Sequence, residues 1–425
     1  MTNDRGPGSR EKEFSAARFF RGESVPDIII IISILLMVLL VPLRQVPRYV
    51  LTFVVLAAWA WKVLVRRERA WHPSPVYRWL MFLTAAACVS GIVNFATGGK
   101  LFREVWRIFE FAVFFFLGFH FIRDDRRREL FGWTVAIAAV VTALCAVLQY
   151  FVSAYVLLPA GNFVDFRGQS ARADAFYFNP DIMGIALVLL SPVVFGLVAG
   201  KDRYGDRRVL LLCVLLLGGV LVSGSYGSVF GLAAAVFVFV LGSAAEGRRG
   251  GTAIRTVWGV IGVLIGMIAG MIFVVGVRPN SFLSRFHMWE TAFQIWRDHP
   301  LFGIGVRNFG EYYSLYAPDG YAGRAFSQTH NLFLQVLCEQ GIAGFLLFLA
   351  VLVVLFREGL RSLRRAPGPF AAYLGLGCCA ACIGGLANGM TVYLFAPQEF
   401  AFLFWLFGGV MCAVAVGKPD PGCAT

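Results

Sequence analysis

The sequence is poor in charged residues. Asp, Glu, Lys and Arg make up only 15% of the chain, whereas a soluble globular protein carries about 25%. Hydrophobic residues account for 58% of the sequence, and its mean hydropathy is +0.71. Apolar runs of roughly 17–25 residues, the length that a hydrocarbon core requires, recur from end to end. This composition excludes a soluble protein and indicates an all-α, polytopic transmembrane helical bundle.

Sites for nucleic acid, metal ions and disulfides are also lacking. The net charge of +13 is not concentrated on a soluble domain, which argues against nucleic-acid binding. No Asp-x-Asp pair stands in an outward loop to hold a metal ion, and no cofactor is indicated. The nine cysteines lie mostly inside apolar runs, and we attribute Cys379-x-x-Cys382, beside Cys378, to helix packing.

The apolar runs predict about twelve spans. They are centred on 27–43, 49–65, 79–97, 105–122, 130–151, 181–199, 208–222, 226–244, 256–276, 331–356, 370–390 and 399–416. Lys and Arg cluster in alternate connections, and the positive-inside rule places these and both chain ends in the cytoplasm. We therefore expect a cytoplasmic segment 1–26, a transmembrane domain 27–416 and a cytoplasmic tail 417–425. The large polar loop 278–330, between spans nine and ten, is then on the opposite side.

This loop should contain helices of its own. Phe286 to Trp296 is rich in helix formers and aromatic residues, and Asp298-His299-Pro300 predicts where that helix ends. Gly303-x-Gly305 and Asn308 predict a turn before residues 309–316. We expect an amphipathic helix at the membrane surface, followed by a spanning helix that begins near Asn331.

A compound motif runs through the same region. Its first half is Arg285, Trp289, Pro300, Leu301-Phe302-Gly303-Ile304-Gly305 and Asn308-Phe309, and its second half is His330-Asn331, Leu334, Glu339 and Gly341-Ile342-x-Gly344. This pattern resembles the signature of the O-antigen ligase and polymerase family. The resemblance implies a multi-pass enzyme of the bacterial inner membrane with its active site on the periplasmic side. Such enzymes transfer a glycan from an undecaprenyl pyrophosphate carrier to an acceptor.

The resemblance also implies which residues bind the diphosphate of the carrier. In the family an arginine precedes a Phe–Asn–Pro stretch, here residues 178–180, and Arg172 matches that position best, with Arg167 as second choice. Arg285 is the second phosphate ligand, and Arg278 is a further helper. A guanidinium suits this task because it grips phosphate oxygens through two parallel hydrogen bonds and stays charged. The alternatives are solvated loop arginines and, for Arg285, a cation near lipid head groups.

The sequence departs from the family pattern at Tyr226. An arginine commonly follows the serine that corresponds to Ser225, but a tyrosine stands there in this chain. A phenol can donate a hydrogen bond or stack on a sugar, but it cannot neutralise phosphate. We assign Tyr226 a supporting role and expect another arginine to substitute.

His330 is the predicted catalytic base. A sugar hydroxyl is poorly nucleophilic until a base takes its proton, and imidazole titrates near neutral pH. Backside attack would invert the anomeric centre, and the arginines would make a metal ion unnecessary. The alternative is an interfacial histidine that caps the tenth span. Glu290 could orient a base, but a salt bridge to Arg297 or Arg285 is the simpler interpretation.

Charged residues also interrupt the fourth apolar run. Helical spacing puts Arg103, Arg107 and Glu110 on one face. Charges at membrane depth usually face a polar cavity or a partner. An anion site and an internal pair of Arg107 with Glu110 both remain open.

Three functions fit the sequence. An O-antigen ligase, which uses a lipid A-core acceptor in lipopolysaccharide biosynthesis, is preferred over an O-antigen or exopolysaccharide polymerase of the same family. A polysaccharide or lipid transporter is the more distant alternative. Transporters tend to consist of paired, inverted halves, but the large loop occurs only once here. This asymmetry favours an enzyme.

Overall fold

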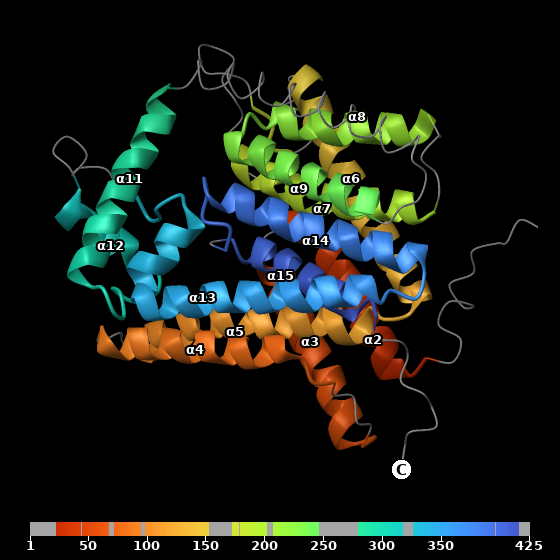
Figure 1. The fold of residues 1–425 in the computed structure, drawn as a ribbon, viewed down its shortest axis with the longest axis horizontal. Helices are drawn as coiled ribbons and strands as arrows, with labels where there is room; N and C mark the ends of the chain where they lie inside the picture. Colours follow the sequence, from red (N-terminus) through yellow and green to blue (C-terminus); the bar gives the residue numbers. More distant parts are fainter. Residues whose placement is uncertain are drawn as a thin grey trace, which may run out of the picture.

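The computed structural model describes residues 23–43, 45–67, 72–94, 98–152, 172–177, 179–201, 207–245, 279–317, 326–395 and 397–415. Within these ranges the chain forms helices and turns and no strand, which confirms the all-α prediction for the part described. The α-helices (Figure 1) are α2 (Val25–Leu39), α3 (Gln45–Leu64), α4 (Pro75–Val93), α5 (Gly98–Phe121), α6 (Asp125–Val152), α7 (Pro180–Gly200), α8 (Arg207–Val222), α9 (Tyr226–Ala245), α11 (Pro279–Asp298), α12 (Phe309–Tyr316), α13 (Leu332–Arg364), α14 (Pro369–Gly389) and α15 (Gln398–Ala413).

Seven of the described helices are long and apolar enough to cross a membrane: α3, α4, α6, α7, α9, α13 and α14. Three more, α2, α8 and α15, are apolar but shorter than the roughly 20 residues that a spanning helix needs. Charged residues, among them Arg107 and Glu110, interrupt α5. The structure therefore supports a helical membrane protein with several spans. The count of about twelve remains a prediction, and its ninth span, 256–276, is outside the described residues.

The centre of the bundle is formed by α7 and α14, which pack against each other, with α9 against α14. Glycines permit this close approach. A Cβ atom on Gly196 of α7 would lie 2.4 Å from the carbonyl oxygen of Tyr373, and one on Gly377 of α14 would lie 2.5 Å from that of Pro192. Lipid gives apolar helices little reason to associate, so small residues that bring backbones together matter more here than in a soluble protein.

A second tight crossing joins α5 and α15. A Cβ atom on Gly118 would lie 2.1 Å from the carbonyl oxygen of Leu406, and one on Gly409 would lie 2.3 Å from that of Phe115. Helix α4 runs beside α13 (Figure 1), α5 packs against α4, and both α13 and α14 contact α15. This half of the bundle is the support on which the long helix α13 rests.

A small outer unit is formed by α11 and α12 at one end of the bundle, beside the start of α13 (Figure 1). It has its own core, made of Met288, Ala292, Ile295, Ile304, Phe309, Tyr313 and Cys338. The predicted loop helix is confirmed and begins earlier than expected, at Pro279, because proline suits the first turn of a helix. Its end at Asp298 and the start of the next helix at Phe309 agree with the sequence analysis.

The long helix α13 is broken at Gly341, whose φ is 64° and ψ is −171°. The segment 300–305, between α11 and α12, fills the break. The N–H of Ile304 donates to the carbonyl oxygen of Cys338 at 3.0 Å, and the N–H of Ile342 donates to that of Pro300 at 2.8 Å. Backbone groups freed by a broken helix must find partners when they are buried, and this segment supplies them.

Helix α4 also bonds to this joint, by which we mean the contact between the segment 300–305 and the break in α13 at Gly341. The Ser90 hydroxyl lies 2.6 Å from the carbonyl oxygen of Phe302 and 3.0 Å from that of Glu339. The side-chain amide of Asn94 donates to the carbonyl oxygen of Gly303 at 3.0 Å. The two halves of the sequence motif therefore contact each other directly, and α4 holds them together.

The charged residues of α5 lie next to a further arginine. Glu110 is buried and accepts a hydrogen bond from Nε1 of Trp106 at 3.2 Å, and the charges of Arg48 on α3 and of Arg107 act on it. Because the Glu110 carboxylate already balances the positive charges of Arg48 and Arg107, the internal ion pair is favoured over a site for an external anion. The side chain of Arg103 is outside the described part of the chain.

Candidate active site

Arg172 is held at the N-terminal end of α7. Its Nη2 donates to Asp181 Oδ1 at 2.5 Å, and its Nε donates to the carbonyl oxygen of Ser223 at 2.7 Å. Asn179 caps α7 by accepting the N–H of Asp181 at 2.8 Å. Helix α7 begins at Pro180, next to the start of the predicted span 181–199, and the cap leaves the Asp181 carboxylate to pair with Arg172.

The short segment that carries Arg172 is anchored to two helices, α6 and α8. Nε2 of Gln149, on α6, donates to Asp174 Oδ1 at 2.8 Å. The N–H of Ala173 donates to the carbonyl oxygen of Val222, the last residue of α8, at 2.9 Å. Because the two residues that follow Arg172 are bonded to membrane helices, the start of the arginine side chain is placed by rigid elements.

The turn between α8 and α9 lies directly under this arginine. Gly224 has a φ of 57°, and a Cβ atom there would lie 3.4 Å from Nε of Arg172. The positive φ and the close side chain both favour glycine. The next residue, Ser225, hydrogen-bonds through its side chain to the Asp181 carboxylate. The turn therefore contacts both partners of the ion pair: the Ser225 hydroxyl contacts Asp181, and the carbonyl oxygen of Ser223 contacts Arg172.

Arg285 reaches the same place from α11. Its guanidinium carbon lies over the ring of Tyr226 at 5.8 Å from the ring centroid, a cation–π contact. Burial lowers the pKa of Arg285, and the negative charge of Asp181 opposes that effect. Asp181 therefore acts on both arginines. Tyr226, which stands where the family commonly has arginine, is a support for Arg285.

His330 precedes α13 in an unusual backbone conformation. Its φ is 52°, a left-handed value that costs a residue with a side chain about 1–3 kcal/mol. Its two neighbours hold this conformation: the Thr329 hydroxyl donates to the carbonyl oxygen of Asn331 at 2.8 Å, and the N–H of Thr329 donates to Gln335 Oε1 at 2.7 Å. Asn331 in turn caps α13 by accepting the N–H of Phe333 at 3.0 Å. The backbone of His330 is therefore held at the N-terminal end of α13.

The electrostatics of the site keep His330 neutral. Burial, followed by the positive charge of Arg285, lowers the pKa of His330 below its ordinary value, and the Asp181 carboxylate opposes the shift. A lowered pKa means that the imidazole is unprotonated at neutral pH and can accept a proton. These charge interactions also show that His330, Arg285 and Asp181 are neighbours.

The predicted residues do not all join this cluster. Glu290 is exposed on α11, and its Oε2 lies 4.0 Å from Nδ1 of His287. Instead of the salt bridge expected with Arg297 or Arg285, Glu290 contacts His287, which lies three residues earlier on the same face of the helix. Arg167 and Arg278 are outside the described residues.

No metal centre is found in the described ranges: no three His, Cys, Asp or Glu residues there are grouped so that they could hold an ion. Cys378, Cys379 and Cys382 are buried in α14, where Sγ of Cys382 lies 3.5 Å from the carbonyl oxygen of Phe404. The site therefore consists of two guanidinium groups, one carboxylate, one imidazole and the hydroxyls around them. Such a set can bind an anion and accept a proton.

Asp181 is the residue of this cluster to which the sequence analysis gave no part in the chemistry. The sequence explains it fully as an acidic residue in the first turn of a helix, a position that the helix dipole favours. The signal that could have revealed its second role is its distance of nine residues from Arg172, at the outer end of an apolar run.

Comparison with known proteins identifies the family of this site. Residues 211–349, which include Tyr226, Arg285 and His330, match the sequence profile of the O-antigen ligase family. The predicted family, O-antigen ligase, is confirmed. The chain is also 27% identical, over 322 residues, to an O-antigen ligase of Pseudomonas aeruginosa (strain PAO1), an alignment that covers 73% of this chain and 70% of that protein. Arg172 and Asp181 precede the stretch that the family profile matches.

Proposed function

We propose that this protein transfers a glycan from undecaprenyl pyrophosphate to a hydroxyl of lipid A-core, and that it acts as the O-antigen ligase of lipopolysaccharide biosynthesis. The observation that carries the proposal is the convergence of Arg172, Arg285 and His330 around Asp181 at one end of the helical bundle. Family membership supports a ligase or a polymerase, and the Pseudomonas relative is a ligase. That relative favours ligation over polymerisation.

The arginines would act on the donor. The bond between the anomeric carbon and a phosphate oxygen breaks during transfer, and the departing diphosphate gains negative charge. Preorganised cations stabilise such a leaving group more strongly in a site shielded from water than in bulk solvent. Before the donor binds, Asp181 keeps Arg172 in place. The more highly charged diphosphate then competes with that carboxylate for the guanidinium.

His330 would act on the acceptor. The neutral imidazole takes the proton of the sugar hydroxyl, whose oxygen attacks the anomeric carbon from the side opposite the diphosphate. The configuration at that carbon inverts. The positive charge that other glycosyltransferases draw from a divalent ion comes here from the arginines, so we propose a metal-independent reaction.

We further propose that this reaction occurs on the periplasmic side of the inner membrane, in the 278–330 loop, with both chain ends in the cytoplasm. The positive-inside rule supports this orientation. The arginines Arg357, Arg361, Arg364 and Arg365 stand at the end of α13 that is farthest along the helix from His330. Residues 1–26 and 417–425 are then cytoplasmic, and the transmembrane domain 27–416 contains the site.

Deletion of the gene, followed by gel analysis of lipopolysaccharide, tests the proposal. A ligase predicts that every long chain disappears from lipid A-core while carrier-linked polymer accumulates. A core that bears a single repeat unit would identify a polymerase instead. An unchanged ladder, with normal core, would contradict both and lead back to an exopolysaccharide enzyme or a transporter.

A further inference from the structure

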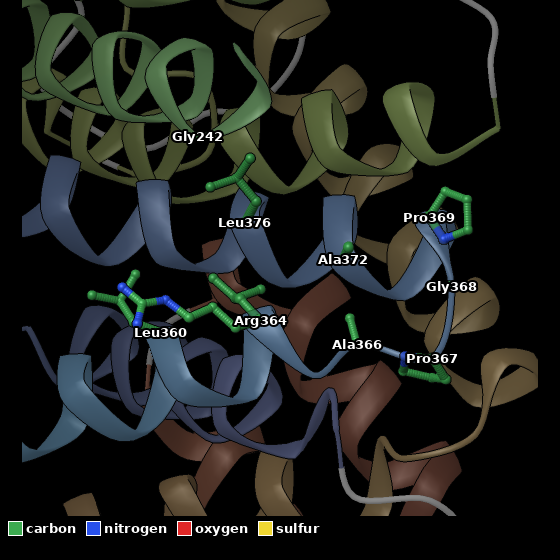
Figure 2. Close-up of a pocket in the computed structure, with 10 residues that line it drawn as sticks. Gly242, Leu360, Arg364, Ala366, Pro367, Gly368, Pro369, Ala372 and Leu376 are labelled. Carbon is green, nitrogen blue, oxygen red and sulfur yellow. The ribbon is translucent and has the colours of Figure 1, made fainter. Parts of the chain in front are cut away.

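A cavity of about 680 Å³ lies where α13 ends and α14 begins, lined also by Gly242 of α9 (Figure 2). It is separate from the active site. Tyr226 opens α9 at the site, and Gly242 lies sixteen residues further along the same helix, roughly 24 Å at 1.5 Å per residue. The volume falls within the range of roughly 300–1,000 Å³ that small-molecule sites occupy.

The side chains that line the cavity are apolar except for that of Arg364. Leu360, Leu363 and Leu376 line the cavity, and Figure 2 shows the Arg364 side chain lying along α13 within it. No carboxylate among the described residues pairs with Arg364, whereas its neighbour Arg361 donates to Glu358 at 2.6 Å. Apolar side chains next to a guanidinium that has no carboxylate partner within the described ranges fit a molecule that has both an anionic group and a hydrocarbon part.

We propose that this cavity binds an anionic phospholipid, with Arg364 on the phosphate and the leucines against the first part of an acyl chain. Basic pockets between membrane helices at the positively charged side of a protein attract acidic lipid head groups. Arg357 and Arg365 add to the positive charge at this end of the bundle. A planar guanidinium binds two phosphate oxygens at once. A soluble phosphate would gain nothing from the apolar walls, and for that reason we assign the site to a lipid.

The glycines of the lining show where the cavity is open and where it is closed. A Cβ atom on Gly242 would lie 2.5 Å from Cδ1 of Leu376, so α9 and α14 are tightly packed there. A Cβ atom on Gly368 would meet nothing within 4 Å, and the φ of Gly368 is −171°, an extended value open to any residue. Gly368→Leu therefore adds a bulky apolar side chain at the lining of the cavity without straining the backbone.

Native mass spectrometry of the full-length chain, released from detergent in the presence of phosphatidylglycerol or phosphatidylcholine, tests the proposal. We expect the wild-type protein to retain phosphatidylglycerol in preference, and Arg364→Gln to weaken that retention about tenfold, since a hydrogen-bonded charge is lost. Arg361→Gln is the matched control, because it removes the same charge one turn away but outside the cavity lining. Gly368→Leu should also reduce retention.

The outcomes of this experiment distinguish a specific lipid site from unspecific attraction to a basic surface. Equal losses in Arg364→Gln and Arg361→Gln would overturn the proposal in favour of unspecific attraction to a charged helix end. Equal retention of the two lipids by the wild type, or unchanged retention in both Arg364→Gln and Gly368→Leu, would overturn it as well. Excess glycerol 3-phosphate should leave the bound lipid in place, and its displacement would show that the site holds a free phosphate.

Discussion

The family motif of this protein consists of two regions that differ in their physics. One region, with Arg285 and His330, presents charged and titratable groups at the end of the bundle. The other, with the segment 301–305 against Gly341, is a backbone joint in which amides and carbonyl groups pair across the break in α13. Both are equally prominent in the sequence, although only the first can perform chemistry.

The joint nevertheless determines where the chemistry takes place. Helix α11, which carries Arg285, continues into the segment that docks on α13, and α13 begins directly after His330. The contact between the two halves of the motif therefore fixes the position of Arg285 relative to His330. Substitutions in the site should reduce activity and leave the protein folded, whereas substitutions in the joint should lower stability first.

The largest effect is expected for His330→Ala. Loss of a general base costs about 10²- to 10⁴-fold in rate, and transfer measured with purified protein and a carrier-linked glycan should fall by that factor. His299→Ala, in the same outer unit and packed edge-on against Tyr312, is the matched control and should stay near wild type. Normal transfer by inserted, folded His330→Ala would remove this histidine as the base.

Arg285→Gln should come next. Loss of one donor to a developing negative charge costs about 10²- to 10³-fold, and Arg285→Lys should recover only part of the loss because an ammonium group cannot form two parallel hydrogen bonds. Arg297→Gln changes an exposed arginine in the last turn of the same helix and provides the control. If Arg285→Gln and Arg297→Gln have equal transfer rates, the location of Arg285 beside Tyr226 has no special part in the reaction.

Gly341→Ala tests the joint. Its left-handed φ costs a residue with a side chain about 1–3 kcal/mol, and a Cβ atom would also lie 2.3 Å from the carbonyl carbon of Leu301. The free energy of unfolding, or the midpoint of thermal unfolding in detergent, should fall accordingly. Gly218→Ala is the control, because its Cβ atom would lie 3.6 Å from Val147, an ordinary contact. If the two variants unfold alike, the break in α13 is not a constrained joint.

Ser90→Ala should destabilise the same joint to a smaller extent. The hydroxyl has one proton to donate and lies between the carbonyl oxygens of Phe302 and Glu339, of which that of Glu339 also accepts the N–H of Gly305 at 2.9 Å. We therefore expect the loss of about one hydrogen bond, about 0.5–1.5 kcal/mol. Ser243→Ala removes a hydroxyl that bonds only within its own helix, to Phe239 at 2.7 Å, and should be close to neutral. A stability loss shared by both variants would argue against a role of Ser90 between α4 and α13.

The sequence predicts the helices well and their long-range contacts poorly. Apolar run length and the stop signal Asp298-His299-Pro300 are local properties, and α11, α12 and the start of α13 agree with them. The break at Gly341 leaves no local signal, because Gly-Ile-Ala-Gly inside an apolar run also suits an unbroken spanning helix. Its cause is a segment some forty residues earlier, which hydropathy cannot link to it.

The same distinction holds for the site. The resemblance to the family motif, together with the residue types that suit phosphate binding and proton transfer, selects Arg172, Arg285 and His330 from the sequence. The role of Asp181 is a matter of tertiary contact: its bond to Arg172 and its effect on Arg285 depend on the position of α11 relative to α7. The role of Tyr226 likewise depends on a tertiary contact, because its ring lies against the guanidinium of Arg285, which comes from another helix.

The smallest and most specific effect concerns pH. Because the pKa of His330 is lowered, the acid limb of kcat/KM should lie below pH 6.5 in the wild-type protein. Arg285→Gln removes a positive charge that lowers this pKa, so the limb should move to higher pH by up to about one unit. Asp181→Asn removes a negative charge that raises it, and the limb should move to lower pH. A general loss of structure would not move the acid limb in opposite directions in the two variants. If the acid limb lies at the same pH in the wild-type protein and in both variants, the charges of Arg285 and Asp181 do not act on His330, and the proposed site is wrong.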